Sequence, residues 1–203
     1  MIIEPMAVQK ERVIMNLERQ KENFKNHKAI FTDYGNIKIL DFSNPNSQNY
    51  RIRFLFEEDY YRLHISGDLG ELIASNYTNM TYERFTDFVN DIGYFESKVD
   101  CHSRPFYFWD EKKARTDLVE MAKKDEWILF SNKYTWESDE ERLNDIISDI
   151  LCDFDEESGI GRRGYEQLSG LEDDIVKTIG KKETGILDLY ILAFKLAKEQ
   201  LEK

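Results

Sequence analysis

The feature that most constrains the fold is an alternation of apolar and other residues within positions 50–75. The regularly spaced apolar positions are Ile52, Phe54 and Phe56, followed by Tyr61, Leu63 and Ile65. A period of two places such side chains on one face of a β-sheet. The polar stretch 57–59 between the two halves is short enough for a hairpin loop. The segment therefore predicts an antiparallel hairpin that runs into a tight turn at 67–70.

Similar patterns on either side predict the remaining elements. Residues 29–32 and 36–42 predict two strands, 72–75 a short fifth strand, and 101–105 an irregular segment. Helical spacing predicts helices at 6–27, 81–92, 110–127, 138–154, 168–179 and from 184 onward. The sequence thus predicts an α+β fold with an N-terminal helix, an antiparallel sheet of four to five strands and a mostly helical C-terminal part.

Two apolar segments bear on how the chain is organised. The last helix carries a wide apolar arc that must be buried against neighbours, or against a second copy in a homodimer if the monomer cannot cover it. The aromatic run 106–109 is expected to fill core between sheet and helices. The expected domains are 1–134, which holds the sheet, and 135–203, an acidic helical region that could also pack on the first as one unit.

Charge narrows the class of partner. The net charge is −12, and residues 135–203, with nine basic and eighteen acidic side chains, carry −9 of it. Such a surface repels nucleic acid and attracts basic protein surfaces. The alternative is that the acidic residues only keep the protein soluble.

The compartment expected from the sequence is the cytoplasm. No apolar run approaches the ~20 residues that cross a bilayer, and the N-terminus becomes charged at once, without the apolar stretch of a signal peptide. In that compartment Cys101 and Cys152 are expected to remain thiols.

Two motif-like patterns lie close together in the acidic region. Residues 159–164 read G-x-G-x-x-G, but no strand precedes them and four carboxylates adjoin them, so a helix–helix loop is predicted instead of a phosphate site. Asp153, Asp155 and Glu157 alternate as in a calcium loop. Ser158 and Gly164 stand where that loop requires glycine and glutamate, so the pattern fails.

Few residues could hold a metal or act as a nucleophile. Cys101 and His102 form the one adjacent pair of zinc-ligand type, and His64 is the next candidate; a structural zinc site needs four ligands. A metal-dependent or thiol hydrolase site would have to form near His64, Asp68, Glu71, Cys101 and His102. No cofactor is expected, and zinc at Cys101, His102 and His64 is the alternative.

Residues 50–98 combine a strand pair that ends in the turn residues Gly67, Asp68, Gly70 and Glu71 with a helix that closes in Gly93, Tyr94, Phe95 and Lys98. In these features the segment resembles small proteins encoded by phages and prophages of Gram-positive bacteria. The resemblance implies a protein that binds and blocks a host machine, as anti-CRISPR (anti-defence) proteins do. It does not include the acidic last third.

The function expected is therefore non-enzymatic inhibition of a bacterial nucleic-acid-handling defence protein, such as a type II CRISPR effector nuclease, in the host cytoplasm and without direct contact with nucleic acid. Carboxylates would occupy the lysines and arginines that normally hold phosphates. The expected partner-binding residues are Glu137, Asp139, Glu140, Asp145, Asp149, Asp153, Asp155, Glu156 and Glu157. A hydrolase and a phage structural or assembly adaptor remain as alternatives.

Overall fold

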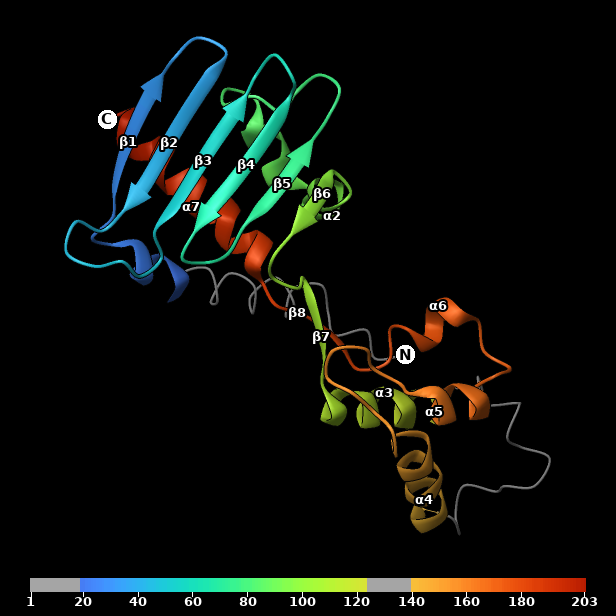
Figure 1. Ribbon diagram of the computed structural model, residues 1–203. Helices are drawn as coiled ribbons and strands as arrows, with labels where there is room; N and C mark the ends of the chain where they lie inside the picture. The colour runs from blue at the N-terminus through green and yellow to red at the C-terminus, as the bar shows by residue number, and fades with distance from the viewer. Residues whose placement is uncertain (1–18, 124–139) are drawn as a thin grey trace. The chain divides into compact units, whose positions relative to one another are not determined.

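The computed structural model describes residues 19–123 and 140–203, except for the side chains of 88–90 and 140–142. Two compact units make up the chain (Figure 1). The inserted unit is Phe106–Thr184, and the sheet unit is formed by the segments before and after it, Ile2–Pro105 and Gly185–Lys203. The boundary expected between 134 and 135 lies outside the described residues. The observed units divide the chain elsewhere, because the last helix packs on the sheet.

Six antiparallel strands form the sheet, in sequence order from one edge to the other. They are β1 (Lys28–Asp33), β2 (Ile37–Ser43), β3 (Ile52–Glu57), β4 (Arg62–Gly67), β5 (Leu72–Ser75) and β6 (Val99–His102). The predicted α+β class is confirmed, with one strand more than expected. The additional strand is β6, in a region expected to be irregular; it pairs with β5 through a register shift at Ile73 and Ala74.

The helices of the sheet unit are residues 19–24, η1 (Phe85–Asn90), α2 (Ile92–Glu96) and α7 (Ile186–Leu201). The rest of the helix expected at 6–27 falls largely outside the described residues. The single helix expected at 81–92 is instead a 3-10 helix followed by α2. Asp91 accounts for the break, because its Oδ1 accepts a hydrogen bond from Tyr94 N (2.8 Å) as the N-cap of α2.

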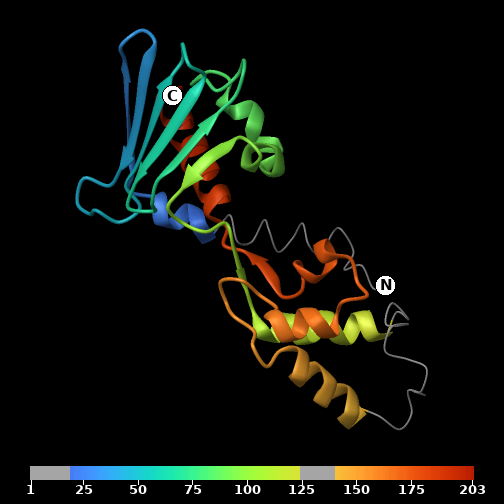
Figure 2. The same ribbon diagram turned by 45° about the vertical axis from the view of Figure 1, so that its right-hand side comes forward.

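One face of the sheet packs against α7 (Figure 2). Phe194 of α7 is fully buried against Phe54, Phe56 and Phe85, whose ring centroids lie 5.3, 5.9 and 4.8 Å from its own. Most of the wide apolar arc of the last helix is thus covered within its own chain, although Leu201 is 42% exposed. A homodimer through this helix, expected if the monomer cannot cover the arc, stays a prediction.

The opposite face of the sheet is open: within the described residues, no helix of the sheet unit covers it (Figures 1 and 2). Its central row runs across the strands through Ile39, Leu55, His64, Ile73 and Cys101, which are register partners in turn. The first four are half-buried and Cys101 is exposed. This face is amphipathic, with apolar side chains between charged ones.

The inserted unit contains two short strands and four helices in its described part. They are β7 (Tyr107–Trp109), α3 (Glu111–Lys123), α4 (Glu140–Ile150), α5 (Arg162–Gln167), α6 (Asp173–Val176) and β8 (Lys181–Glu183). The C-terminal part is mostly helical, as predicted, and also contains the short strand β8, which pairs antiparallel with β7. The core role expected for the aromatic run was wrong: Phe108 is 39% exposed, because the run forms one strand of a two-stranded ribbon.

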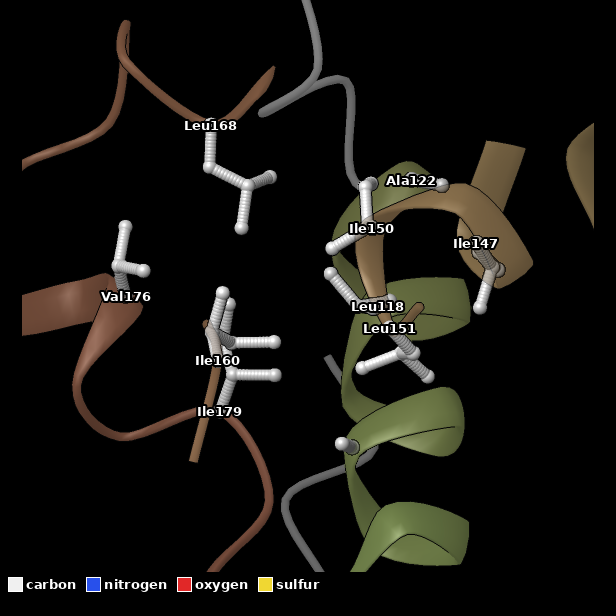
Figure 3. Close-up of a cluster of buried hydrophobic side chains, with 10 residues drawn as sticks. Leu118, Ala122, Ile147, Ile150, Leu151, Ile160, Leu168, Val176 and Ile179 are labelled. Atoms are coloured by element: carbon white, nitrogen blue, oxygen red, sulfur yellow. The ribbon is translucent and has the colours of Figure 1, made fainter. Parts of the chain in front are cut away.

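A separate hydrophobic core holds the inserted unit together (Figure 3). Leu118 of α3 and Ile147 and Ile150 of α4 lie on one side of it, and Leu168 and Val176 lie on the other. All five side chains are at most 2% exposed. Burial of an aliphatic side chain contributes about 1.5–3 kcal/mol, so this core fixes how α4 presents its outer face.

Candidate functional site

The predicted acidic surface begins on α4. Ile147 and Ile150 are buried, whereas Asp145 and Asp149 are exposed and lie one turn apart on the outer face. The last turn of α4 carries no basic side chain. Carboxylates near a helix C-terminus oppose the helix dipole. The end of α4 therefore concentrates negative charge that the helix itself does not compensate.

Asp153, just beyond α4, has a structural task. Its Oδ2 accepts a hydrogen bond from the backbone N of Arg163 (3.0 Å), at the start of α5. A Cβ on Gly161 would lie 2.2 Å from Asp153 O, so this approach requires glycine. The carboxylate thus uses an amide that a phosphate would need in a nucleotide site. Only the first half of the glycine motif lies in the connection after α4; residues 162–164 form the first turn of α5, a helix that the predicted loop did not include.

Asp155 closes the next turn. Its Oδ1 accepts hydrogen bonds from the backbone N of Glu157 (2.9 Å) and from the N and Oγ of Ser158 (3.0 Å each). These hydrogen bonds lower the pKa of Asp155, chiefly the one from Glu157, so the carboxylate is held ionised. The side chains of Glu156 and Glu157 are exposed. The loop thereby displays two carboxylates on a turn that a third one stabilises.

None of the acidic residues predicted here has an ion-pair partner among the residues that the structure describes. Five ion pairs occur in the described part of the inserted unit: Lys113–Asp117, Arg115–Glu111, Arg162–Glu166, Lys177–Asp174 and Lys182–Asp110. Asp145, Asp149, Asp153, Asp155, Glu156 and Glu157 take part in none of them. Glu137, Asp139 and the side chain of Glu140 lie outside the described residues. Arg115 and Arg162 instead pair with Glu111 and Glu166 on their own helices.

The glycine turn of the sheet unit is a scaffold. Asp68 Oδ2 accepts a hydrogen bond from Tyr50 N (2.9 Å), and Asp68 N donates to Arg51 O (2.9 Å), so the turn is tied to the start of β3. Tyr190 of α7 donates its hydroxyl to Leu69 O (3.0 Å), and burial raises the pKa of Tyr190 to about 12. The carboxylate of Asp68 is thus used to anchor the turn to a neighbouring strand.

The zinc candidates do not converge. His64 and Cys101 share a row on the open face but are separated by β5, which corresponds to ~10 Å at the usual strand spacing; zinc ligands lie ~2 Å from the metal. His64 Nε2 lies 3.1 Å from Glu57 Oε2, and His102 Nδ1 lies 2.7 Å from Arg104 O. In the described part of the chain no three His, Cys, Asp or Glu side chains form a group that could hold a metal.

The open face also carries a groove that sequence reasoning missed. It has a volume of about 390 Å³ and is lined by Asp41, Arg51, Arg53, Ser66, Gly67 and Glu71. Arg53 binds Asp41 through two hydrogen bonds (2.7 and 3.0 Å), which raises the pKa of the guanidinium. Asp41 and Arg53 are register partners on β2 and β3, so a correct strand alignment was the signal that could have revealed the pair. The groove combines opposite charges that largely neutralise one another.

Comparisons with known proteins add no relative. A scan against protein-family models, a search of curated proteins and a search of solved structures each found no match. Among the described residues no helix combines the length and apolar character that would let it span a bilayer.

Proposed function

We propose that this protein is a non-enzymatic phage or prophage protein that binds a bacterial nucleic-acid-handling defence protein and inhibits it in the host cytoplasm. The observation that supports the proposal is a set of exposed carboxylates, on the outer face of α4 and in the loop after it, that have no ion-pair partner among the residues that the structure describes. Asp145, Asp149, Glu156 and Glu157 form this set, which we name the acidic patch.

Electrostatics explains why a basic surface fits the acidic patch. Phosphate-binding surfaces are built from lysine and arginine, and carboxylates form charge-assisted hydrogen bonds with the same groups. A cation placed at the end of α4 would also relieve the unfavourable interaction between Asp149 and the helix dipole. Complementary charge raises association rates by steering and makes binding sensitive to salt. The patch would thereby compete with nucleic acid for its binding surface.

The first partner to test is a type II CRISPR effector nuclease. A purified panel of such nucleases is titrated with the protein, with and without guide RNA, and DNA cleavage is measured in parallel. The variant combines Asp145→Lys, Asp149→Lys, Glu156→Lys and Glu157→Lys. The matched control reverses the same number of exposed carboxylates in the sheet unit: Glu83→Lys, Asp100→Lys, Glu199→Lys and Glu202→Lys. Asp153 and Asp155 are left intact because they hold the loop.

We expect the wild-type protein to bind the nuclease in its guide-free state. The affinity of this binding should decrease as the salt concentration increases. The acidic-patch variant should lose at least about 100-fold in affinity, because four charge-assisted contacts of about 1.5–3 kcal/mol each are reversed. The control should stay within about threefold. An acidic-patch variant that inhibits like the wild type would refute the mechanism. Tight binding to a virion protein in place of any nuclease would instead support the adaptor alternative.

A further inference from the structure

Exposed tyrosines gather at one end of the sheet. Because the strands are antiparallel and in sequence order, the connections β1–β2, β3–β4 and β5–β6 all leave the sheet at the same end, the upper end in Figure 1. Each connection carries an exposed tyrosine: Tyr34 (67% exposed), Tyr60 (70%) and Tyr77 (91%), and α2 adds Tyr94 (43%). We name these four residues the tyrosine end.

This concentration is unusual for a surface that only faces water. The large apolar side chains exposed in the described residues are Ile30, Tyr34, Tyr60, Tyr77, Tyr94, Phe108, Ile175 and Leu201, and half of them belong to the tyrosine end. Tyrosine combines a large apolar ring with a polar tip and few rotatable bonds, so it is enriched in protein–protein interfaces and among their energetic hot spots. Gathered apolar rings on a surface mark interaction sites more often than scattered ones do.

Hydrogen bonds join the connections to one another. Glu58 N donates to Asn36 O (2.7 Å) and Asn36 Nδ2 donates to Asp59 Oδ2 (2.9 Å), which links the first two. Asn76 N donates to Tyr61 O (3.0 Å), which links the second to the third. Tyr61 has a positive φ of 48°, a conformation that costs energy for a residue other than glycine and persists where its surroundings enforce it. A surface held in this way loses little conformational freedom on binding.

The polar groups indicate the class of partner. Asn36 and Asp59 bond to each other, Asn76 bonds to Asn79 and Tyr94, and Glu58 pairs with Lys38 at 3.1 Å. Carbohydrate recognition needs free side-chain groups for sugar hydroxyls, but these groups are engaged in holding the connections. What the connections expose to solvent is mainly the rings of Tyr34, Tyr60 and Tyr77. This favours a folded protein surface over a glycan.

Charge indicates which protein surface fits. Residues 33–36 and 57–61 contain four acidic and no basic side chains. Glu57 pairs with Arg62 and Glu58 with Lys38, whereas Asp33 and Asp59 have no ion-pair partner among the described residues. The rings already attract the cations of this chain: Lys98 Nζ lies 4.7 Å from the Tyr94 ring centroid and Arg62 Cζ lies 6.0 Å from that of Tyr60. Cations bind favourably over tyrosine faces. We propose that the tyrosine end binds a folded protein that presents arginine and lysine side chains, at a surface separate from the acidic patch.

The probe is a naive display library of a small folded scaffold, selected against the full-length protein. Binders are mapped with the triple variant Tyr34→Ser, Tyr60→Ser and Tyr77→Ser. Tyr94 is kept because its hydroxyl bonds to Asn76. The control is Ile30→Ser, Phe108→Ser and Ile175→Ser, which removes three other exposed apolar side chains (61, 39 and 41% exposed). Circular dichroism checks that both variants keep the thermal unfolding temperature of the wild type.

We expect most binders to be rich in arginine and to lose at least about tenfold in affinity for the tyrosine variant, the effect of removing hot-spot residues, while binding the control normally. They should bind the acidic-patch variant as well as the wild type, so failure of the proposed function would leave this result intact. Binders that map evenly over the surface would overturn the proposal. The proposal would also be overturned if the wild type bound a glycan on an array, the tyrosine variant did not, and the library binders failed to map to the same tyrosines.

Discussion

Replacing Phe194 by alanine tests whether α7 holds the sheet unit together. The ring is fully buried, and its centroid lies 4.8 Å from that of Phe85, 5.3 Å from Phe54, 5.8 Å from Tyr82 and 5.9 Å from Phe56. All four partners approach edge-on. The ring therefore connects α7 to β3 and to η1.

The magnitude follows from these contacts. A buried Phe→Ala change costs about 3–5 kcal/mol in total through lost burial, lost ring contacts and the cavity left behind. The four pairs place the expected loss at the upper end, about 4–5 kcal/mol. A domain has only about 5–15 kcal/mol of stability. Leu201→Ala on the same helix is the matched control, because Leu201 is 42% exposed and should cost less than about 1 kcal/mol.

Two probes can follow the two units separately. Hydrogen exchange of peptides from β3, measured against urea, reports the sheet unit. Exchange of peptides from α3, measured in the same samples, reports the inserted unit. Phe194→Ala should lower the stability of the sheet unit and leave the stability of the inserted unit unchanged. A loss no larger than that of Leu201→Ala would refute the view that this ring organises the core.

Two further predictions concern the sheet unit. Burial lowers the pKa of His27 from its ordinary value of 6.5. The stability that His27 contributes is therefore fully present above pH 6.5, and it falls by about 1.4 kcal/mol per pH unit as the pH drops from 6.5 toward the lower pKa of the folded state. His27→Gln should flatten this pH dependence, measured as the midpoint of urea unfolding. A Cβ at Gly67 would lie 2.0 Å from Arg51 O, whereas one at Gly35 would meet open space, although both have positive φ. Gly35→Ala should therefore cost about 1–2 kcal/mol and Gly67→Ala clearly more in thermal unfolding. If Gly35→Ala and Gly67→Ala lost equal stability, the positive φ alone would explain both effects, and the contact with Arg51 O would contribute nothing.

The sequence predicted the part of the fold in which one face of an element is buried. The hairpin of β3 and β4 was found because Ile52, Phe54 and Phe56 must alternate to reach the core. β6 was missed because it is an edge strand with three exposed residues and no alternation. β8, with the sequence KKE, has no apolar signal at all and is set by its pairing with the distant β7.

The sequence predicted which acidic residues make up the candidate site, but it did not predict what each of them does in the structure. A count of carboxylates located the acidic region, but only the structure separates Asp153, which bonds to the start of α5, from the exposed Glu156 and Glu157. Tyr34 and Tyr77 are distant in sequence, and their common position at one end of the sheet depends on strand order. Both distinctions rest on long-range contacts that local patterns do not encode.

The place of α7 at the end of the chain has a consequence for biosynthesis. The helix that completes the sheet core is translated only after the whole inserted unit, at about 5–20 residues per second. On the ribosome, the inner face of the sheet is therefore synthesised several seconds before Phe194. By the time Phe194 is added, the inserted unit already has all its core residues. During that interval the nascent sheet exposes its aromatic face to chaperones or to other nascent chains. A premature stop before residue 186 would make this exposure permanent.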